Sequence, residues 1–284
     1  AASDVYKRQV DIINLMIDSK LQEELRARFN PDGSELRTYQ LYLLDMLKDF
    51  DQICKNLGLK YWLSSGTLIG AARHGGFIPW DDDIDVEMLK EDYDKLLATF
   101  KESDKYVIQS HENDPYYFQV FGKFRDKKSI LDENQLCQKY YKFHGAFIDL
   151  LTMNFTNKNA SKLIFKAINI LSIPLKTSKR IPRWLIYTSK VSIGLVFKFI
   201  PIIEKFYRHK NNLIFGHDYG SYFHYTKRDF SKLFPLRTAT FEGYSFPVPN
   251  DIEGYLSATY PDWEKLPDFA HLQPHLQGIQ YIGS

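Results

Sequence analysis

Residues 64–88, "SSGTLIGAARHGGFIPWDDDIDVEM", carry the most specific pattern in the sequence. Four of the five residues from Asp81 to Asp85 are aspartates, and apolar residues flank them on both sides. An isolated acidic run is most often a solvated turn or a weak surface calcium site. Two features favour a functional site here: acidic and apolar residues alternate after Asp82, and a Ser-Gly-Thr turn stands shortly upstream.

The alternation predicts a β-strand over residues 83–88. Successive side chains of a strand point to opposite faces, so Asp83 and Asp85 would share one face while the apolar residues face the core. Adjacent carboxylates repel each other, and either one is protonated or a cation neutralises both. Mg²⁺ is usually held by one or two carboxylates together with substrate phosphates, so this pair is a candidate metal site. Asp81 and Asp82 would lie at the mouth of the strand.

The turn upstream is a candidate anion site. Ser65, Gly66 and Thr67 stand where a short helix is predicted to begin, and the first turn of a helix offers N–H groups and the positive end of its dipole. Together with the acid-apolar-acid strand, this turn describes a place for a phosphate and a place for its metal. Arg73 and His74 end the helix, where they would neutralise charge on a leaving group or, equally, interact with the helix C-terminus.

Asp149 is a third candidate carboxylate, because it stands alone among apolar residues in "GAFIDLLTM", residues 145–153. A lone acid in such a run must be paired, protonated or functional. The alternative to a functional role is a salt bridge to an arginine. If Asp149 lies beside Asp83 and Asp85, three carboxylates meet around a metal and act in catalysis, an arrangement that suits transfer of a phosphoryl-type group.

Two basic residues complete the candidate site. Lys123 and Arg125 alternate on a predicted strand and therefore share a face, which suits contact with phosphate. A solvated strand face is an equally good interpretation of this pair.

The remaining pattern predicts a fold with helices and a mixed sheet. Apolar positions at helical spacing over residues 36–57, followed by Gly58, predict a core helix with a glycine C-cap. Further strands are predicted at residues 59–65, 105–109, 116–125 and 145–153, and an amphipathic helix at 89–100. Short strands around Gly243 precede a helix capped by Asn250 or Asp251. This order favours an α/β or α+β domain.

Composition sets the limits of the interpretation. A chain of 284 residues with 44% hydrophobic and 25% charged residues permits one large domain or two smaller ones. Cys54 and Cys137 form no CxxC pair, so neither a disulfide framework nor a zinc site is expected, and a cytoplasmic location fits. We expect no secretory signal peptide, and residues 1–9 are set aside as a cloning or assembly remnant.

A basic region interrupts the chain. Residues 162–210 hold eleven Lys and Arg against one acidic residue, which gives them a net charge of +10 and leaves −8 for the rest. The region is predicted to be helical, broken into pieces by Pro174, Pro182 and Pro201. We therefore expect four parts: an extension at 1–35, a catalytic core at 36–155, a basic helical insertion at 156–215 and a segment at 216–284 that packs back on the core.

A helix over residues 183–208 would carry its basic residues within an arc of about 80°, beside a broad apolar surface. Such helices lie on anionic membranes, although a core helix with a solvated stripe has the same pattern. No uninterrupted apolar run approaches the roughly 18–20 residues of a membrane span, so a transmembrane helix is not expected. No recognisable nucleic-acid motif accompanies the basic residues, and nucleic acid is not an expected partner. The basic residues of the arc are Arg183, Lys190, Lys198, Lys205 and Arg208.

"SGTLIGAARHGGFIPWDDDIDV" closely resembles the signature of the LicD family of phosphotransferases, and "FGKFRDKKS", "GAFIDLL" and "FEGYSFPVPNDIEGYLSATYPDWEKLPD" are similar to that family's later segments. The resemblance runs from about residue 36 to 268 and is weakest at 157–210. It implies an α+β nucleotidyltransferase fold of the DNA polymerase beta type, with a mixed sheet flanked by helices. The distance from Thr67 to Asp83 is longer than in the polymerase-like pattern but matches the LicD pattern.

The resemblance also implies an activity. A LicD enzyme would move phosphocholine, or a related alditol- or sugar-linked phosphate, from a CDP-linked donor such as CDP-choline to a hydroxyl of a cell-surface glycan. An acceptor glycan built on a lipid carrier would fit the membrane-side location that the basic stripe of residues 183–208 allows. Asp83 and Asp85 would hold Mg²⁺ or Mn²⁺ at the donor pyrophosphate, and Asp149 would be a third ligand or the base. Gly66 and Thr67 would cradle donor phosphate.

A choline headgroup needs aromatic rings around its quaternary ammonium. The candidates for this cage are Trp80, Tyr116, Tyr117, Phe118 and Phe121. Two other functions remain open: a nucleotidyltransferase that moves NMP to a protein, small molecule or sugar phosphate, and a non-catalytic domain that binds a glycan or a partner. A location in the cytoplasm, at the inner face of the membrane if the basic helix binds lipid, fits the main interpretation.

Overall fold

A computed structural model describes residues 17–132, 138–177, 180–209, 212–223, 226–269 and 278–281. Cys137 and residues 1–9 lie outside these ranges. The protein is α+β, as predicted, and its chain forms two compact units. The first unit comprises residues 1–87 and 229–276, and the second comprises residues 88–228 and 277–284.

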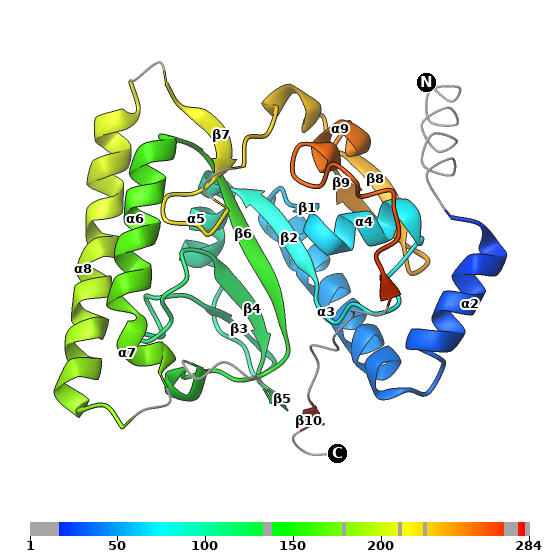
Figure 1. Cartoon of the computed structure of the whole chain (residues 1–284), viewed down its shortest axis with the longest axis horizontal. Helices are drawn as coiled ribbons and strands as arrows, with labels where there is room; N and C mark the ends of the chain where they lie inside the picture. Colours follow the sequence, from blue (N-terminus) through cyan, green and yellow to red (C-terminus); the bar gives the residue numbers. More distant parts are fainter. Residues whose placement is uncertain are drawn as a thin grey trace. The chain divides into compact units, whose positions relative to one another are not determined.

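The first unit is built from four helices and two strand pairs in its described residues (Figure 1). Its elements are α2 (Ser19–Phe29), α3 (Glu35–Leu57), β1 (Trp62–Leu63), α4 (Ser65–Arg73), the start of β2 (Asp85–Leu89), the 3₁₀ turn η2 (Phe230–Lys232), β8 (Arg237–Phe241), β9 (Tyr244–Val248) and α9 (Ile252–Ser257). The predicted core helix is confirmed as α3, and Gly58 ends it in the left-handed conformation with φ 63°. The buried face of α3 carries Leu43, Leu47 and Phe50, which are fully enclosed.

Two antiparallel pairings shape this unit. β1 pairs with β2, with Trp62 opposite Glu87. β8 and β9 form the hairpin predicted around Gly243, and its turn places Glu242 at φ 51° and Gly243 at φ 80°. Positive φ at both central residues gives the backbone twist that a tight hairpin requires.

Where the structure describes it, the second unit contains an antiparallel sheet and four helices. The strands β3 (Tyr106–Gln109), β4 (Gly122–Asp126), β6 (Phe147–Thr156) and β7 (Ile214–His217) pair in that order. β5 (Ser129–Leu131) pairs separately with β10 (Ile279–Tyr281). The other elements are α5 (Lys90–Thr99), the 3₁₀ turn η1 (Gln138–Tyr140), α6 (Lys158–Leu171), α7 (Ile173–Lys176) and α8 (Arg183–Tyr207).

The region predicted to be a basic helical insertion is helical, and α6, α7 and α8 pack on one another. A shared core joins these helices, with Ile164, Ile168, Ile193 and Phe197 among its buried residues. The proline prediction was right at two of three positions, because α8 continues through Pro201.

Two predicted elements are corrected. The strand expected at residues 116–125 is confined to β4, because the chain turns at Asp114, whose carbonyl accepts from the N–H of Tyr117. The strand expected from residue 83 begins at Asp85. The nucleotidyltransferase topology and the four-part division stay predictions, although residues 17–35 group with the first unit.

Length and composition alone do not exclude a membrane span, although the sequence was interpreted as excluding one. Among the described residues, α8 is long and apolar enough to cross a bilayer, with 22% of its most apolar window buried inside the protein. Lys190, Lys198 and Lys205 interrupt the apolar residues of α8, so no uninterrupted apolar run reaches the length of a span, as the sequence indicated.

Candidate functional site

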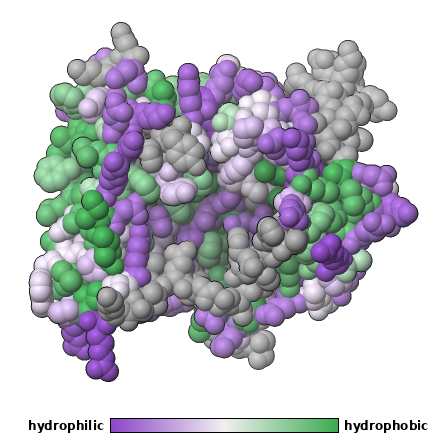
Figure 2. Space-filling model, viewed as in Figure 1, coloured by the Kyte–Doolittle hydropathy of each residue, from purple (hydrophilic) through white to green (hydrophobic). Residues whose placement is uncertain are grey.

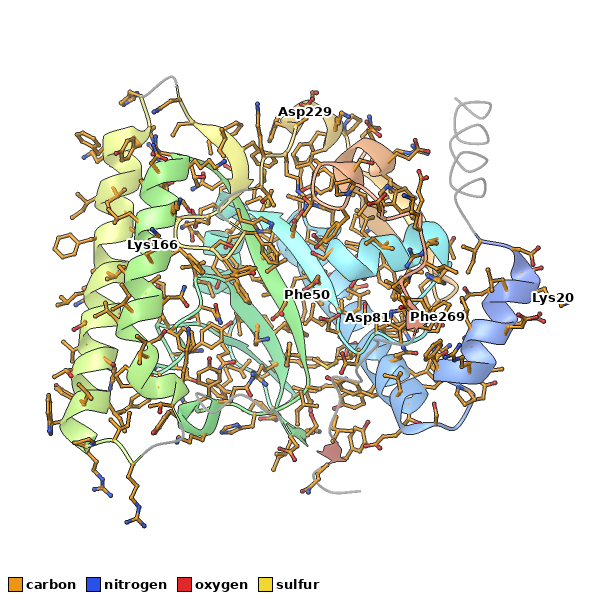
Figure 3. All side chains as sticks on the ribbon, in the orientation of Figure 1. Lys20, Phe50, Asp81, Lys166, Asp229 and Phe269 are labelled. Atoms are coloured by element: carbon orange, nitrogen blue, oxygen red, sulfur yellow. The ribbon has the colours of Figure 1, made fainter. Side chains whose placement is uncertain are left out.

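The acidic loop, residues 74–84, joins α4 to β2. Its end keeps the alternation of acidic and apolar residues that the sequence predicts. Asp83 and Asp85 are half-buried, whereas Ile84 and Val86 are completely buried. The two carboxylates therefore share the solvent-facing side of the segment. Asp81, two residues further upstream, is labelled in Figure 3.

The first turn of α4 is bonded to the start of β2. The hydroxyl of Thr67 accepts from the N–H of Asp85 at 2.9 Å, and the N–H of Ser64 donates to the Asp85 carbonyl at 3.1 Å. Ser64, the N-cap residue of α4, makes no side-chain capping hydrogen bond, so its hydroxyl does not occupy the first-turn N–H groups. The predicted adjacency of helix start and acidic strand is confirmed.

Gly66 brings the helix start against a carboxylate of the loop. A Cβ at this position would lie 2.6 Å from Oδ2 of Asp81, closer than side chains tolerate. The positive end of the α4 dipole thus lies next to an acidic side chain. The preceding residue, Ser65, adopts φ 46°, a left-handed conformation that is uncommon outside glycine.

Negative charge is crowded within the loop. Burial, followed by the charges of Asp83 and Asp82, raises the pKa of Asp81 well above its usual range. Like charges at close range disfavour simultaneous ionisation, and a cation bound nearby would relieve them.

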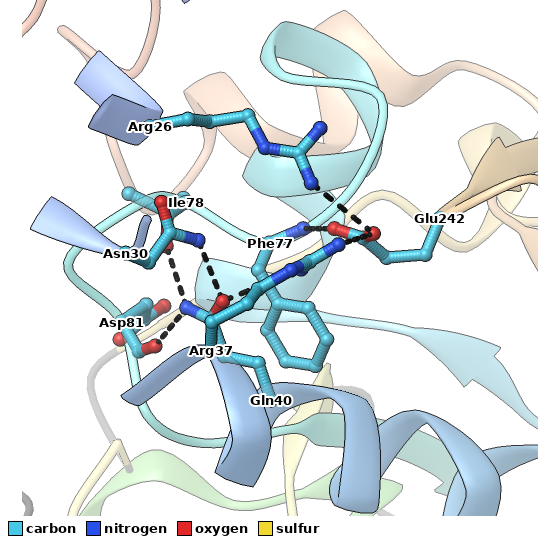
Figure 4. Close-up of polar contacts among 8 residues, drawn as sticks. All are labelled: Arg26, Asn30, Arg37, Gln40, Phe77, Ile78, Asp81 and Glu242. Atoms are coloured by element: carbon cyan, nitrogen blue, oxygen red, sulfur yellow. Dashed lines mark hydrogen bonds and ion pairs between the residues drawn. The ribbon is translucent and has the colours of Figure 1, made fainter. Parts of the chain in front are cut away.

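A buried polar network holds this loop in place (Figure 4). Nε2 of Gln40, on α3, donates to the carbonyl of Asp81 at 2.7 Å, and the side-chain oxygen of Gln40 accepts from Asn30 at 2.7 Å. Gln40 is fully buried. In the sequence, Gln40 stands four positions after Leu36 and three before Leu43, which places it on the apolar face of the predicted helix. A polar residue on that face was the sign from which its buried role could have been predicted.

The hairpin residue Glu242 holds the other end of the loop. Its Oε1 accepts from the N–H of Phe77 at 3.0 Å, and its Oε2 forms a 2.6 Å ion pair with Arg37 (Figure 4). A Cβ on Gly76 would overlap the Glu242 carboxylate, so only glycine permits this approach. The ion pair and the Phe77 hydrogen bond offset the burial of Glu242 and keep its pKa below the usual range.

Arg73 and His74 are used inside the first unit. The guanidinium of Arg73 donates to the carbonyls of Trp263 and Lys265 at 2.6 and 2.8 Å, and its Nε donates to Nε2 of His74 at 2.9 Å. Nδ1 of His74 then donates to Gln22 at 2.6 Å. Burial and the Arg73 charge lower the pKa of His74 to about 3, so the imidazole is neutral. These contacts favour a structural role over neutralisation of a leaving group.

Lys123 and Arg125 lie on β4 and are buried, which contradicts a solvated strand face. Arg125 is fully enclosed, with Nε donating to Gln109 at 2.6 Å and Nη1 to the Gly145 carbonyl at 2.5 Å. Nζ of Lys123 lies 2.6 Å from Oδ1 of Asp149, its neighbour on β6. Arg125 is therefore a core residue, whereas Lys123 belongs to the surroundings of Asp149.

Asp149 has a counter-charge, as a lone acid in an apolar strand requires, but the partner is Lys123 and not an arginine. Asp83 and Asp85 lie in the first unit and Asp149 in the second, so the three-carboxylate centre stays a prediction. Across the described ranges, no three His, Cys, Asp or Glu side chains form a group that could hold a metal ion.

Two of the aromatic cage candidates are core residues. Tyr117 and Phe118 are buried in the cluster beneath α6 and α8. Trp80 belongs to an aromatic group of the first unit, with its ring centroid 5.3 Å from those of Phe29 and Phe269. Tyr116 has the ammonium of Lys190 5.2 Å from its ring centroid, so a lysine already lies over that ring.

The last candidate, Phe121, lines a cavity of about 290 Å³ in the second unit, which the sequence did not predict. Other residues of its wall include Tyr93, Lys90, Glu204 and Asp218. Burial raises the pKa of Asp218 to about 6, against the opposing effect of Lys90.

The family profile described as LicD/FKTN/FKRP, nucleotidyltransferase domain, matches residues 58–176. The chain contains a LicD family domain. This LicD domain includes α4, the acidic loop, Lys123 and Asp149. The chain is 29% identical over 268 residues to the lipopolysaccharide cholinephosphotransferase LicD of Haemophilus influenzae, a match that covers 87% of this chain and 98% of that protein.

Two eukaryotic transferases match shorter segments. Ribitol 5-phosphate transferase FKRP of Homo sapiens is 57% identical over 35 residues, which is 12% of this chain and 7% of that protein. Ribitol-5-phosphate transferase FKTN of Mus musculus is 40% identical over 50 residues, 17% of this chain and 11% of that protein.

Proposed function

We propose that this LicD domain protein transfers a phosphorylated alcohol, with phosphocholine as the first candidate, from a CDP-linked donor to a hydroxyl group of a cell-surface glycan. The observation that carries the proposal is the nearly full-length similarity to a lipopolysaccharide cholinephosphotransferase. The ribitol-phosphate transferases support the broader class, because they too are named as transferases of a phosphorylated alcohol.

The acidic loop would hold a divalent cation. Asp83 and Asp85 are half-buried on one side of their segment, and the crowding that raises the pKa of Asp81 is the condition a cation relieves. Two carboxylates are sufficient protein ligands for Mg²⁺ when donor phosphates and water complete the octahedron, and Mn²⁺ accepts the same oxygen donors. A bound cation would neutralise charge on the leaving nucleotide.

The start of α4 would bind a donor phosphate. Ser65, Gly66 and Thr67 form its first turn, and no side-chain cap from Ser64 competes for the N–H groups. Helix N-termini bind phosphate through these N–H groups and the dipole. The hydrogen bond from Asp85 to Thr67 keeps this turn next to the acidic segment.

Asp149 would receive the proton of the acceptor hydroxyl. The ammonium of Lys123 contacts Oδ1, so it compensates the carboxylate charge and fixes the orientation of the group. A general base must reach the proton that it removes at hydrogen-bond distance. This role requires that the acceptor binds beside β6.

The test is to follow the label in three donors offered with a lipopolysaccharide acceptor and Mg²⁺: CDP-choline labelled in choline, CDP-ribitol labelled in ribitol, and CTP labelled in the base. Label from the alcohol portion should enter the glycan, with CMP released. Label from CTP in the product would instead show nucleotidyl transfer, which the domain's description as a nucleotidyltransferase makes the specific alternative. No transfer from either CDP-alcohol would contradict the proposal.

A further inference from the structure

The outward side of α8 carries a continuous stripe of large apolar side chains. Seven residues, three or four positions apart, are between 42% and 66% exposed, and we call them the α8 apolar face. They are Trp184, Tyr187, Val191, Leu195, Phe199, Ile202 and Phe206. Side chains at this spacing form one stripe along a helix. Contiguous apolar surface on this scale marks an interaction site.

The opposite side of α8 is occupied by the protein itself. Ser189, Ile193, Phe197 and Ile200 are buried, and the Ser189 hydroxyl donates to the carbonyl of Leu171 at 2.6 Å. The helix is thus fixed to the second unit along one side and presents the apolar face on another. Figure 2, viewed as Figure 1, shows hydrophobic surface gathered over α6 and α8.

Basic residues border the α8 apolar face along the whole helix. Arg183, Lys198, Lys205 and Arg208 are exposed. The one acidic residue of α8, Glu204, is half-buried and accepts from Asn154 at 3.2 Å, so it does not offset the exposed positive charges. A border of one sign favours a partner of opposite charge and disfavours a second copy, which would bring like charges into one interface.

The neighbouring helices α6 and α7 also expose apolar side chains, and lysines lie among them. Leu163 and Ile170 on α6 and Ile173 on α7 are 58% to 70% exposed. Exposed lysines, including Lys162 and Lys166, stand among them, and Figure 3 labels Lys166. Apolar side chains interspersed with lysine fit the boundary between lipid headgroups and acyl chains.

We infer that the α8 apolar face docks on an anionic lipid bilayer, with α8 lying in the plane of the membrane. An in-plane position suits both the α8 apolar face and the basic residues beside it. The apolar side chains enter the acyl region, and the basic side chains remain at the lipid phosphates. A spanning position does not suit them, since it would carry Lys198 into the hydrocarbon and replace the protein core on the buried side with lipid. The cytoplasmic leaflet, rich in anionic lipid, provides such a surface. The inference rests on exposed side chains and goes beyond the proposed transfer reaction.

The test is partition of the full chain onto vesicles, measured by sedimentation. Vesicles of phosphatidylcholine with 25% phosphatidylglycerol should bind the protein, and pure phosphatidylcholine should bind it far more weakly. Phe199→Ser/Ile202→Ser should lower the partition coefficient by at least about tenfold, and Lys198→Gln/Lys205→Gln by roughly fivefold per residue. A matched control, Leu41→Ser/Ile130→Ser, removes two apolar side chains that are 43% and 46% exposed elsewhere and should bind as the unmodified chain does.

Depth measurements separate an in-plane helix from a spanning one. Tryptophan fluorescence quenched by lipids brominated at different depths would be read at position 184 and, in a Trp184→Phe background, in Leu195→Trp and Phe206→Trp. All three should lie at one shallow depth, about 5–10 Å below the headgroups. Position 195 at the bilayer centre, no binding to anionic vesicles, binding that the variants leave unchanged, or self-association through this face would each overturn the inference. Transfer to a soluble acceptor is measured in parallel, because loss of that activity reports on the proposed function and not on membrane docking.

Discussion

The ammonium of Lys123 lies 2.6 Å from a carboxylate oxygen of Asp149, directly across from it on the adjoining strand. The side chains are only 11% and 17% exposed, so each charge depends on the other. The aromatic ring of Phe147 lies beneath the ammonium, 3.2 Å from it. This arrangement gives the mostly enclosed Asp149 carboxylate a counter-charge.

Removing one member of this pair should cost more stability than removing both. Lys123→Met and Asp149→Asn should each lower the free energy of unfolding by about 2–3 kcal/mol, because a poorly solvated charge remains. Lys123→Met/Asp149→Leu should cost less than the sum of the single variants. Urea denaturation of all three variants gives the free energy of interaction between Lys123 and Asp149. If the loss of stability in the double variant equals the sum of the losses in the single variants, the pair contributes no interaction energy.

The same variants separate positioning from catalysis. If Asp149 removes the acceptor proton, Asp149→Asn should lower kcat by about 10²–10⁴-fold, whereas Lys123→Met, which keeps the carboxylate, should lower it much less. Equal losses in the two variants would mean that Asp149 acts only through its ion pair.

Gly66→Ala should impair activity through the acidic loop. The added Cβ would meet the Asp81 carboxylate at 2.6 Å and displace it. Gly194→Ala, on α8, is the matched control, because a Cβ there meets no atom within 4 Å. The control should stabilise the protein by about 0.5–1 kcal/mol through helix propensity with transfer unchanged, while Gly66→Ala loses transfer. Full activity in Gly66→Ala would show that the close approach to Asp81 has no functional role.

Glu242→Gln should loosen the acidic loop without unfolding the protein. The variant retains an acceptor for the Phe77 N–H but leaves Arg37 without its 2.6 Å ion-pair partner. We expect KM for the donor to rise more than kcat falls, because the loop is held less precisely while its carboxylates are intact. Glu102→Gln, which removes an exposed ion pair with Lys127, is the control and should leave both constants unchanged. Equal KM and kcat values for the two variants would show that Glu242 does not position the acidic loop for donor binding.

Asp218 should destabilise the protein as pH rises. Burial raises its pKa to about 6, above the value of 3.8 for an unperturbed aspartate. The folded state therefore favours the protonated form, and this contribution, complete below about pH 4, is lost as pH rises to 6 and above. Asp218→Asn stays neutral, so it should be more stable than the unmodified chain by about 2–3 kcal/mol at pH 7, with no difference near pH 4. Thermal unfolding across this range tests it, and a difference independent of pH would contradict it.

Much of the acidic loop could be predicted because its determinants are local. Alternation of acids with Ile84 and Val86 gives the strand, and glycine at position 66 marks the helix start that lies against the loop. The C-cap at Gly58 and the N-cap at Asp251 follow from the same short-range rules.

The contacts that the sequence did not predict join residues far apart along the chain. Lys123 meets Asp149 only because of the register between β4 and β6, which a 20-residue connection leaves open to sequence reasoning. Glu242 reaches Phe77 across 165 positions. The burial of Arg125 likewise depends on tertiary packing, since the same alternation describes a solvated face.

Asp83 and Asp85 are proposed to bind the cation on which transfer depends. Turnover of CDP-choline and binding of Mn²⁺, both measured in Asp83→Asn/Asp85→Asn, test this role. Its control is Asp45→Asn/Asp262→Asn, which removes the same charge at exposed positions of the first unit. We expect the first variant to keep the melting temperature of the unmodified chain and to lose both Mn²⁺ binding and transfer, while the control retains both activities. Turnover by Asp83→Asn/Asp85→Asn at the rate of the unmodified chain would show that these carboxylates do not hold the cation.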